Sequence, residues 1–363
     1  MSSRNVAGPT RRKSVPKRCI LRQATLLGTR DGGAFENPMF IVAEVDEQGR
    51  VASHDTYDIE DRDGALARLA ELAAPTRAEP HFENAASRAW REVIAAWRGR
   101  DLERFAALQP GLHRYRDHRR LFQLDLDREG FLEFTRPLLT LRSASAELEL
   151  LATRGERLAL MRFTLEMEDE VVGPSAIDSL LLIETDERGA ITAYDRYEVD
   201  DQEAARAELE ARWEAGEGAA HAHAAAWNVG FDAAVDRRDW VAAASFFAPA
   251  FVGNDERLAG WGTLHGPTGF LVAAKTMVEL APDVRTRTQH LRTSSRALLQ
   301  DKVWFGTRDG GAFESPFVGV IELDGDGRAL RMDLYDPHHL DRALARFEEI
   351  GAEPNPHSPF PAR

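Results

Sequence analysis

The sequence contains copies of itself, and this constrains the fold more than any other feature. The nine residues at 28–36 (GTRDGGAFE) recur without a change at 306–314, and the match continues in register well beyond these blocks. A more diverged copy lies between them, since DERG at 186–189 aligns with DEQG at 46–49. The repeat is about as long as one small domain, so we expect several copies of one domain.

The copies divide the chain into two full units and one partial unit. The full units span 81–215 and 221–350, whereas residues 19–75 match only their second half. This partial unit is therefore expected to be incomplete, with the strand half of the repeat and no helical start. We expect a basic, disordered arm at 1–18, which carries no acidic residue, and a flexible tail at 351–363.

Each full unit begins with helical patterns and ends with strand patterns. In the last unit, Trp227, Phe231 and Val235 are spaced as on one face of an amphipathic helix. The strand-like stretches are 286–293, 297–306, 317–323 and 329–335, and their counterparts are 145–151, 157–167, 179–184 and 190–197. Helices followed by a meander of strands are typical of an α+β fold. We expect tandem cone-shaped units, in each of which helices pack in a curved antiparallel sheet.

The closing segment of the last unit, GRALRMDLYDP at 327–337, resembles the last strand of the SnoaL-like branch of the nuclear transport factor 2-like superfamily. Phe247, Pro249 and Phe251 form a second motif of this kind. The resemblance implies a cone-shaped fold that hosts isomerases, cyclases, hydrolases, dehydratases and catalytically silent binding domains, so it implies no single function. Tandem units of this kind also resemble C-terminal regions of large actinobacterial cyclase or ATPase proteins, which implies a bacterial, regulatory protein.

Composition limits the partners of the chain. Its formal net charge of −14 argues against nucleic acid and anionic membranes as partners. No apolar run approaches the roughly 18 residues that cross a bilayer. Cys19 is the only cysteine, which excludes an intrachain disulfide and a cysteine-rich metal site. We therefore expect a soluble, cytoplasmic protein with no cofactor.

Two Asp-x-Tyr pairs supply the candidate catalytic residues, Asp195 with Tyr197 and Asp333 with Tyr335. The members of each pair are two residues apart on a strand, so their side chains share one face. A carboxylate in an apolar cavity can act as a general base. Similar family members, the limonene epoxide hydrolases, close with Arg-Asp-Tyr-Phe-Asp, and this resemblance implies that Asp195 and Asp333 match their catalytic aspartate. The Arg-x-Asp pair that those hydrolases need is missing here, and the same face is also compatible with solvent or a partner sheet.

Aromatic residues and one histidine at core or cavity positions are the candidate ligand-binding residues, namely Trp90, Tyr115, Trp227, Trp261 and His265. Core packing is the alternative role for the aromatic side chains. His338 and His339 flank a helix without a matching set of carboxylates, and we expect no metal there.

Three functions are compatible with these residues. The first is a non-catalytic, regulatory module that binds a small apolar ligand or mediates association. It is favoured because identity between the copies is strongest at 28–36, outside the expected cone, whereas cavity positions vary. The second is a cofactor-free proton-transfer enzyme of the cyclase or isomerase type that uses a cavity aspartate. The third is a structural module that self-associates through sheet faces or through docking of residues 19–75.

Overall fold

The computed structural model describes residues 18–30, 33–45, 51–73, 82–140, 143–168, 175–257, 260–308 and 310–352. The chain forms two compact units, Met1–Glu79 and Pro80–Arg363. The arm expected at 1–18 lies outside the described residues except for its last residue, and so does the tail expected at 351–363 except for its first two residues.

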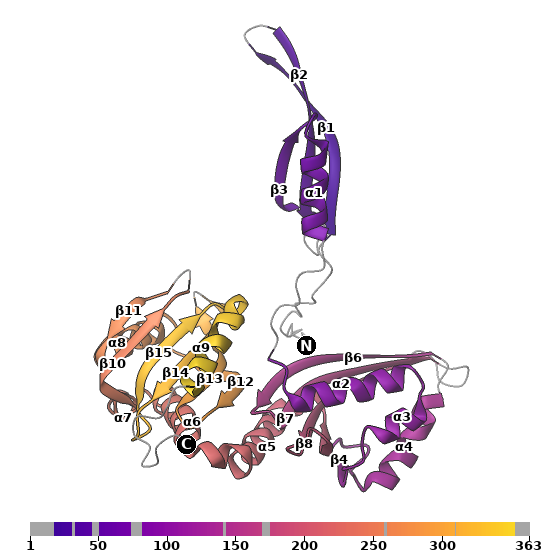
Figure 1. Ribbon diagram of the computed structural model, residues 1–363, viewed down its shortest axis with the longest axis vertical. Coiled ribbons are helices and arrows are strands. Elements are labelled where there is room, and N and C mark those ends of the chain that lie inside the picture. Colours follow the sequence, from indigo (N-terminus) through magenta and orange to yellow (C-terminus); the bar gives the residue numbers. More distant parts are fainter. Residues whose placement is uncertain are drawn as a thin grey trace, which may run out of the picture. The chain divides into compact units, whose positions relative to one another are not determined.

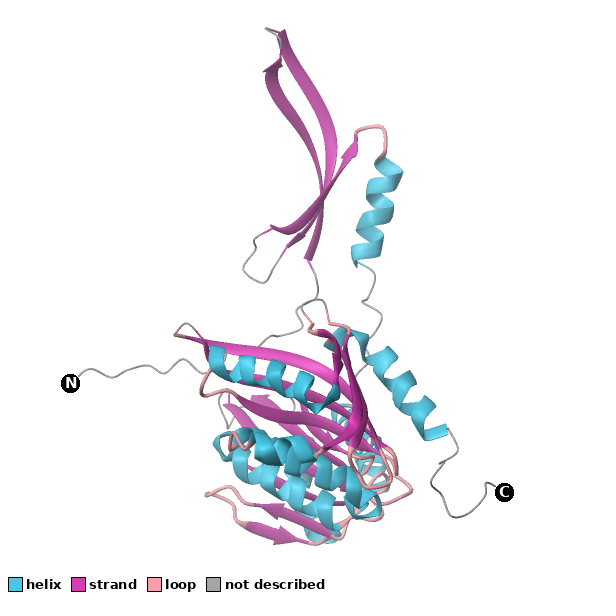
Figure 2. Ribbon diagram, turned by 90° about the vertical axis from the view of Figure 1, so that its left-hand side faces the viewer, coloured by secondary structure: helices cyan, strands magenta, loops and turns pink. Residues whose placement is uncertain are grey.

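The smaller unit is a three-stranded antiparallel sheet with one helix along it (Figures 1 and 2). The elements are β1 Arg18–Arg30, β2 Gly33–Val45, β3 Val51–Asp58 and α1 Arg62–Ala73, in the sheet order β1-β2-β3. Asp61 precedes α1 and accepts a hydrogen bond from the Gly64 amide (3.1 Å), as an N-cap residue does. Ala65 of α1 and Val42 of β2 are fully buried. The structure thus adds a helix to the strand half that the repeat predicts.

The larger unit contains one sheet of twelve strands, in the order β11-β10-β15-β14-β13-β12-β6-β7-β8-β9-β4-β5. The strands are β4 Arg114–Asp117, β5 Leu124–Leu126, β6 Ser143–Arg154, β7 Leu158–Glu168, β8 Ser175–Thr185, β9 Ile191–Tyr197, β10 Phe247–Asp255, β11 Gly262–His265, β12 Arg285–Thr293, β13 Ala297–Arg308, β14 Gly311–Leu323 and β15 Ala329–Tyr335. Among these described strands, β4–β9, β10–β15 and β12–β6 are parallel pairs, and the other neighbours are antiparallel. The α+β class and the curved sheet that the sequence predicts are confirmed (Figure 2).

Each half of this sheet wraps around three helices and forms a cone. We call residues 82–197 the middle cone and residues 222–335 the last cone. The helices of the middle cone are α2 Ala85–Arg98, α3 Leu102–Ala107 and α4 Arg128–Thr140. Those of the last cone are α6 Ala222–Asp236, α7 Trp240–Ser245 and α8 Gly266–Leu280. The boundary between the two full units remains a prediction.

A trailing helix covers the outer face of each cone. These helices are α5 Gln202–Ala215 and α9 Leu340–Ala352, and short 3₁₀ turns flank them at η1 Val199–Asp201, η2 Glu217–His221 and η3 Pro337–His339. On α5, Leu209 and Trp213 are fully buried and belong to the same core as Leu160 of β7. The neighbouring Met161 instead belongs to the core inside the middle cone. Both faces of this sheet are therefore covered by helices.

The sequence of α2 shows why the helices lie inside the cones. Asn84 and Ser87 form a capping box at its N-terminus, in which each side chain bonds the backbone amide of the other residue. Trp90, Ile94 and Trp97 are spaced by four and three residues and are all buried. This apolar face therefore packs into the concave side of the sheet.

The two cones meet at the seam between β6 and β12. These strands pair in parallel over only two residue pairs, at Thr153 and Arg154 of β6. The Arg154 guanidinium is buried and donates hydrogen bonds to the carbonyl oxygens of Thr288 (3.0 Å) and Gln289 (2.9 Å). Its Nε lies 2.9 Å from Oε2 of Glu210 on α5. One side chain therefore links both cones and the helix between them.

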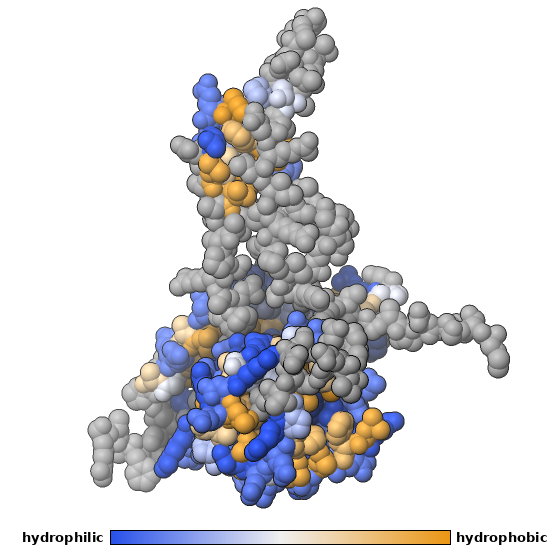
Figure 3. All heavy atoms as spheres, turned by 90° about the vertical axis from the view of Figure 1, so that its right-hand side faces the viewer, coloured by the Kyte–Doolittle hydropathy of each residue, from blue (hydrophilic) through white to orange (hydrophobic). Residues whose placement is uncertain are grey.

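The surface of the larger unit is mixed in character. On the face that Figure 3 shows, hydrophilic side chains cover most of this unit and apolar side chains form separate groups. Within the part of the chain that the structure describes, no helix combines the length and the apolar character needed to cross a membrane.

Candidate functional site

The predicted catalytic aspartates are buried and ion-paired. Asp195 is 1% exposed, and its carboxylate lies 2.6 Å from Nη2 of Arg212 and 2.9 Å from Nε2 of His118. Asp333 is 2% exposed and accepts hydrogen bonds from Nε of Arg331 (2.8 Å) and of Arg346 (3.3 Å). Arg212 and Arg346 belong to the trailing helices α5 and α9. Both aspartates thus face the outer, helix-covered side of the sheet.

The partner tyrosines lie on the same outer side. Tyr197 stacks on His118 with ring centroids 4.6 Å apart, and Tyr335 packs with residues of α9. Burial raises the pKa of both phenols, and the charges of Asp195 and Asp333 raise it further. Neither aspartate and neither tyrosine is among the residues that line the cavities of the cones. Their catalytic role remains a prediction that these contacts do not favour.

The smaller unit repeats the same contact. Asp55 of β3 pairs with Arg68 of α1 at 2.8 Å, at the positions that match Asp333 and Arg346 in the repeat. In all three copies an aspartate of the closing strand therefore binds an arginine of the helix that follows. This explains the repeated motif through the attachment of the trailing helix.

An aromatic cavity of ≈ 60 Å³ lies inside the middle cone. Tyr194 of β9 lines it, and its ring lies 5.0 Å from that of Trp90, 4.9 Å from that of Tyr115 and 4.8 Å from that of Phe131. Trp90 and Tyr115, two of the predicted ligand-binding residues, line this cavity. Tyr194 was not predicted, although it precedes Asp195 and so points to the opposite face of the strand.

Three polar groups on the cavity residues have no hydrogen-bond partner among the residues that the structure describes. They are the hydroxyl of Tyr194, Nε1 of Trp90 and Nη2 of Arg196, and all three atoms are buried. The Arg196 side chain is held in place by a hydrogen bond from its Nε to the Ser179 hydroxyl (3.0 Å). Burial raises the pKa of Tyr194 well above its ordinary value, so its hydroxyl keeps its proton and remains a donor. Buried donors without partners are rare, and each one calls for an explanation.

A buried ion pair supports the wall of this cavity. Asp117 of β4 accepts hydrogen bonds from Nε (2.9 Å) and Nη2 (2.7 Å) of Arg119 and from the Tyr115 hydroxyl (2.9 Å). Burial alone would raise the pKa of Asp117, but the hydrogen bonds and charge of Arg119 lower it below the ordinary value. Asp255 and Arg257 form the same pair in the last cone, at 2.7 Å. The sequence analysis missed this repeated Asp-x-Arg motif, which an alignment of the two full units would reveal.

The last cone contains a smaller cavity of ≈ 30 Å³. Trp227 and Trp261, two of the predicted ligand-binding residues, line it. His265 does not, because it is exposed at the end of β11, directly before α8. Lys302 and Asp232, which the sequence analysis also missed, form an ion pair in this cavity with Nζ 2.7 Å from Oδ1.

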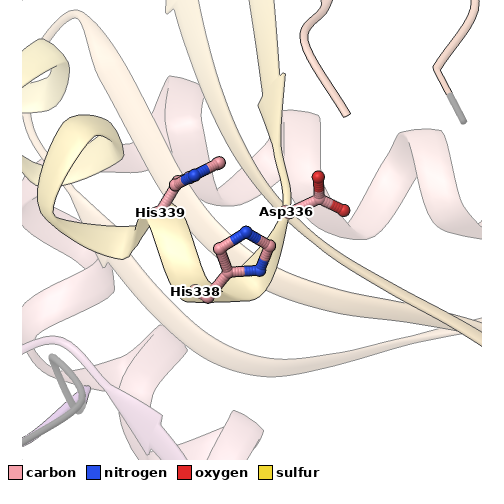
Figure 4. A group of neighbouring side chains, drawn as sticks. All are labelled: Asp336, His338 and His339. Atoms are coloured by element: carbon pink, nitrogen blue, oxygen red, sulfur yellow. The ribbon is translucent and has the colours of Figure 1, made fainter. Parts of the chain in front are cut away.

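His338 and His339 lie together with Asp336 on the turn after β15 (Figure 4). The ligand-type atoms of the three residues lie within 4.8 Å of one another, and the histidine rings are 4.1 Å apart. The group has one ligand fewer than a closed tetrahedral site, and His338 is exposed.

No family model matches the chain, and no curated protein matches it. Three solved structures each match about a third of the chain with a TM-score of 0.27. A protein with a ketosteroid isomerase-like fold from Catenulispora acidiphila, crystallised with trimethylamine, is 15% identical over 30% of this chain and 83% of its own. A protein described as a SnoaL-like polyketide cyclase from Shewanella denitrificans is 12% identical over 33% of this chain and 95% of its own. A Mycobacterium tuberculosis protein in complex with estradiol-17β-hemisuccinate is 14% identical over 31% of this chain and 92% of its own. The solved structures that resemble this chain thus include proteins described as SnoaL-like and as ketosteroid isomerase-like.

Proposed function

We propose that the middle cone is a binding module for a small aromatic molecule that carries one hydrogen-bond acceptor, such as a carbonyl oxygen. The observation that carries this proposal is the set of buried, unpartnered donors on Trp90, Tyr194 and Arg196 around an apolar cavity. An apolar pocket with a few convergent polar groups is the usual form of a small-molecule site.

The energetic cost of these donors supports a ligand. A buried donor without a partner costs about 1–3 kcal/mol relative to its hydrated state. Phenylalanine in place of Tyr194 would keep the ring contacts and avoid this cost. The hydroxyl is therefore better explained by a bound acceptor than by packing. The aromatic rings around it provide the flat, apolar surface that an aromatic ligand needs.

Binding is favoured over proton transfer in this cone. Asp117, the carboxylate nearest in sequence to the cavity residue Tyr115, is held by Arg119 and has a lowered pKa, which makes it a poor base. Asp195 is ion-paired on the outer face. A proton-transfer activity that uses Asp195 or Asp333 therefore has less support than binding. Self-association through sheet faces and docking of residues 19–75 remain predictions.

Two ligands of matched shape test the proposal. Acetophenone carries a carbonyl oxygen, and isopropylbenzene has nearly the same shape without an acceptor. We expect the full-length protein to bind acetophenone about tenfold more tightly in calorimetric titrations, the equivalent of one well-made hydrogen bond. Tyr194→Phe should remove this preference.

Tyr197→Phe is the matched control, because it removes a hydroxyl from the same strand but from the outer face. It should leave the preference for acetophenone unchanged. Equal affinities for the two ligands, or a preference that survives Tyr194→Phe, would contradict the proposal.

A further inference from the structure

The wall of the middle cavity carries one charged side chain. Arg196 of β9 is 8% exposed, and among the described residues that line this cavity it is the only charged one. Its Nη2 atom is buried and has no hydrogen-bond partner within the described part of the chain. An arginine side chain stays protonated at neutral pH even where it is buried. The apolar cavity therefore faces a buried cation with an unused donor.

The contacts of this cation leave its charge without a counter-charge of its own. Asp117 is close enough for its charge to act on Arg196, but both carboxylate oxygens of Asp117 are bound by Arg119, at 2.9 and 2.7 Å. The direct contacts of Arg196 are with neutral groups, since its Nε donates to the Ser179 hydroxyl (3.0 Å) and its guanidinium lies 5.4 Å from the centre of the Phe163 ring. Burial lowers the pKa of Arg196, and the charge of Arg119 lowers it further. The surroundings therefore disfavour this charge.

The last cone shows that the scaffold does not need a charge at this position. The motif DRY at 195–197 aligns with DLY at 333–335, so Leu334 matches Arg196. Leu334 lines the smaller cavity of the last cone. A buried charge without a counter-ion is costly, whereas an apolar side chain occupies the same position of the fold without this cost. The arginine is therefore better explained by a negatively charged ligand than by packing.

We infer that the ligand of the middle cone presents an ionised carboxylate to Arg196. This inference rests on the binding function proposed above and narrows the hydrogen-bond acceptor of the ligand to one charged group. One carboxylate oxygen accepts from Nη2 of Arg196, and the other is left for the Tyr194 hydroxyl or for Nε1 of Trp90. A hydrogen bond between an arginine and a carboxylate is about twice as strong as one between neutral groups. No carboxylate belongs to the described wall of this cavity, so none would repel such a ligand.

Two matched pairs of ligands separate the charge from the aromatic ring. Benzoate has nearly the shape of acetophenone, and acetate has nearly the shape of acetone, but only the carboxylates are charged. In calorimetric titrations of the full-length protein we expect benzoate to bind about tenfold more tightly than acetophenone. Acetate should displace bound benzoate at a lower concentration than acetone does.

Arg196→Leu is the decisive variant, because Leu334 shows that leucine suits this position of the fold. It should weaken benzoate by about tenfold and acetophenone by less than about threefold, with an unchanged circular dichroism spectrum. Arg196→Lys keeps the charge and should keep part of the preference for benzoate. Arg162→Leu is the matched control, since Arg162 pairs with Asp178 (2.9 Å) and does not line the cavity. It should leave the affinity for benzoate unchanged.

The outcomes separate this inference from the function on which it rests. The inference is overturned if neither carboxylate binds, or if Arg196→Leu leaves the affinity for the carboxylates unchanged. A preference for acetophenone over isopropylbenzene with no further preference for benzoate would support the proposed function and overturn this inference. Binding of acetate that depends on Arg196, without binding of benzoate or acetophenone, would refute the aromatic ligand and leave the carboxylate site intact.

Discussion

Replacing Tyr194 by phenylalanine should stabilise the ligand-free protein. The side chain is 2% exposed, and its hydroxyl has no hydrogen-bond partner within the described part of the chain. Folding therefore removes this group from water without compensation. The contacts of the ring with Trp90, Tyr115 and Phe131 do not involve the hydroxyl and remain in the variant. From the cost of one unsatisfied buried donor we expect a gain of about 1–2 kcal/mol in the free energy of unfolding.

Tyr115→Phe is the internal control, since it removes a hydroxyl from the same aromatic cluster but should change the free energy of unfolding in the opposite direction. The Tyr115 hydroxyl donates to the Asp117 carboxylate at 2.9 Å, and a hydrogen bond to a charged group contributes about 1.5–3 kcal/mol. Its loss should therefore destabilise the protein. The assay is urea unfolding followed by fluorescence, with the midpoints compared at equal slope. A loss of stability in Tyr194→Phe similar to that in Tyr115→Phe would show that the Tyr194 hydroxyl has a partner in the free protein, and the reasoning would fail.

Three further substitutions test the contacts that build the larger unit. Arg212→Met leaves the buried Asp195 carboxylate without its closest cation. Urea unfolding should show that the free energy of unfolding falls by about 3 kcal/mol. An unchanged urea midpoint would contradict the ion-pair assignment. Arg154→Met removes the side chain that links the two cones at the seam. Calorimetry should then resolve a separate unfolding transition for each cone in place of a common one. A single unfolding transition at an unchanged temperature would contradict this role. Burial raises the pKa of Asp301 to about 7. The folded chain therefore keeps a proton that the unfolded chain loses near pH 4. The stability that this bound proton contributes is lost as the pH rises from about 4 through 7. Asp301→Asn should therefore gain stability relative to the natural protein between about pH 4 and pH 8 in parallel urea titrations, and a constant difference would contradict the raised pKa.

The sequence predicts much of the architecture because the repeat aligns helical and strand patterns across copies. In each full unit, apolar residues recur first with the period of a helix and then with the period of a strand, and this order predicts an α+β cone. The spacing of Trp90 and Trp227 on their helices places both rings on the apolar helix face, at core or cavity positions, and both are buried and line the cavities. These features depend on local patterns, which one sequence shows directly.

The orientation of the closing strand could not be predicted in the same way. Alternation shows that Asp195 and Tyr197 share a face, but it does not show which face is inside when helices cover both. Tyr194, one position earlier, lies on the cavity side. The contact of Lys302 with Asp232 was missed for a related reason, since it joins a strand to a helix far away in the sequence. Such contacts follow from packing and not from local spacing.

The two trailing helices differ in what their outer faces contact. On α5, Glu210 reaches across to Arg154 at the seam, so the helix is enclosed between two cones. On α9, the matching residue Glu348 is exposed. A helix with a polar outer side offers no apolar surface that would recruit a further copy. The same structural element therefore has two environments in this chain: α5 is covered by the neighbouring cone, and α9 turns its outer residues to water.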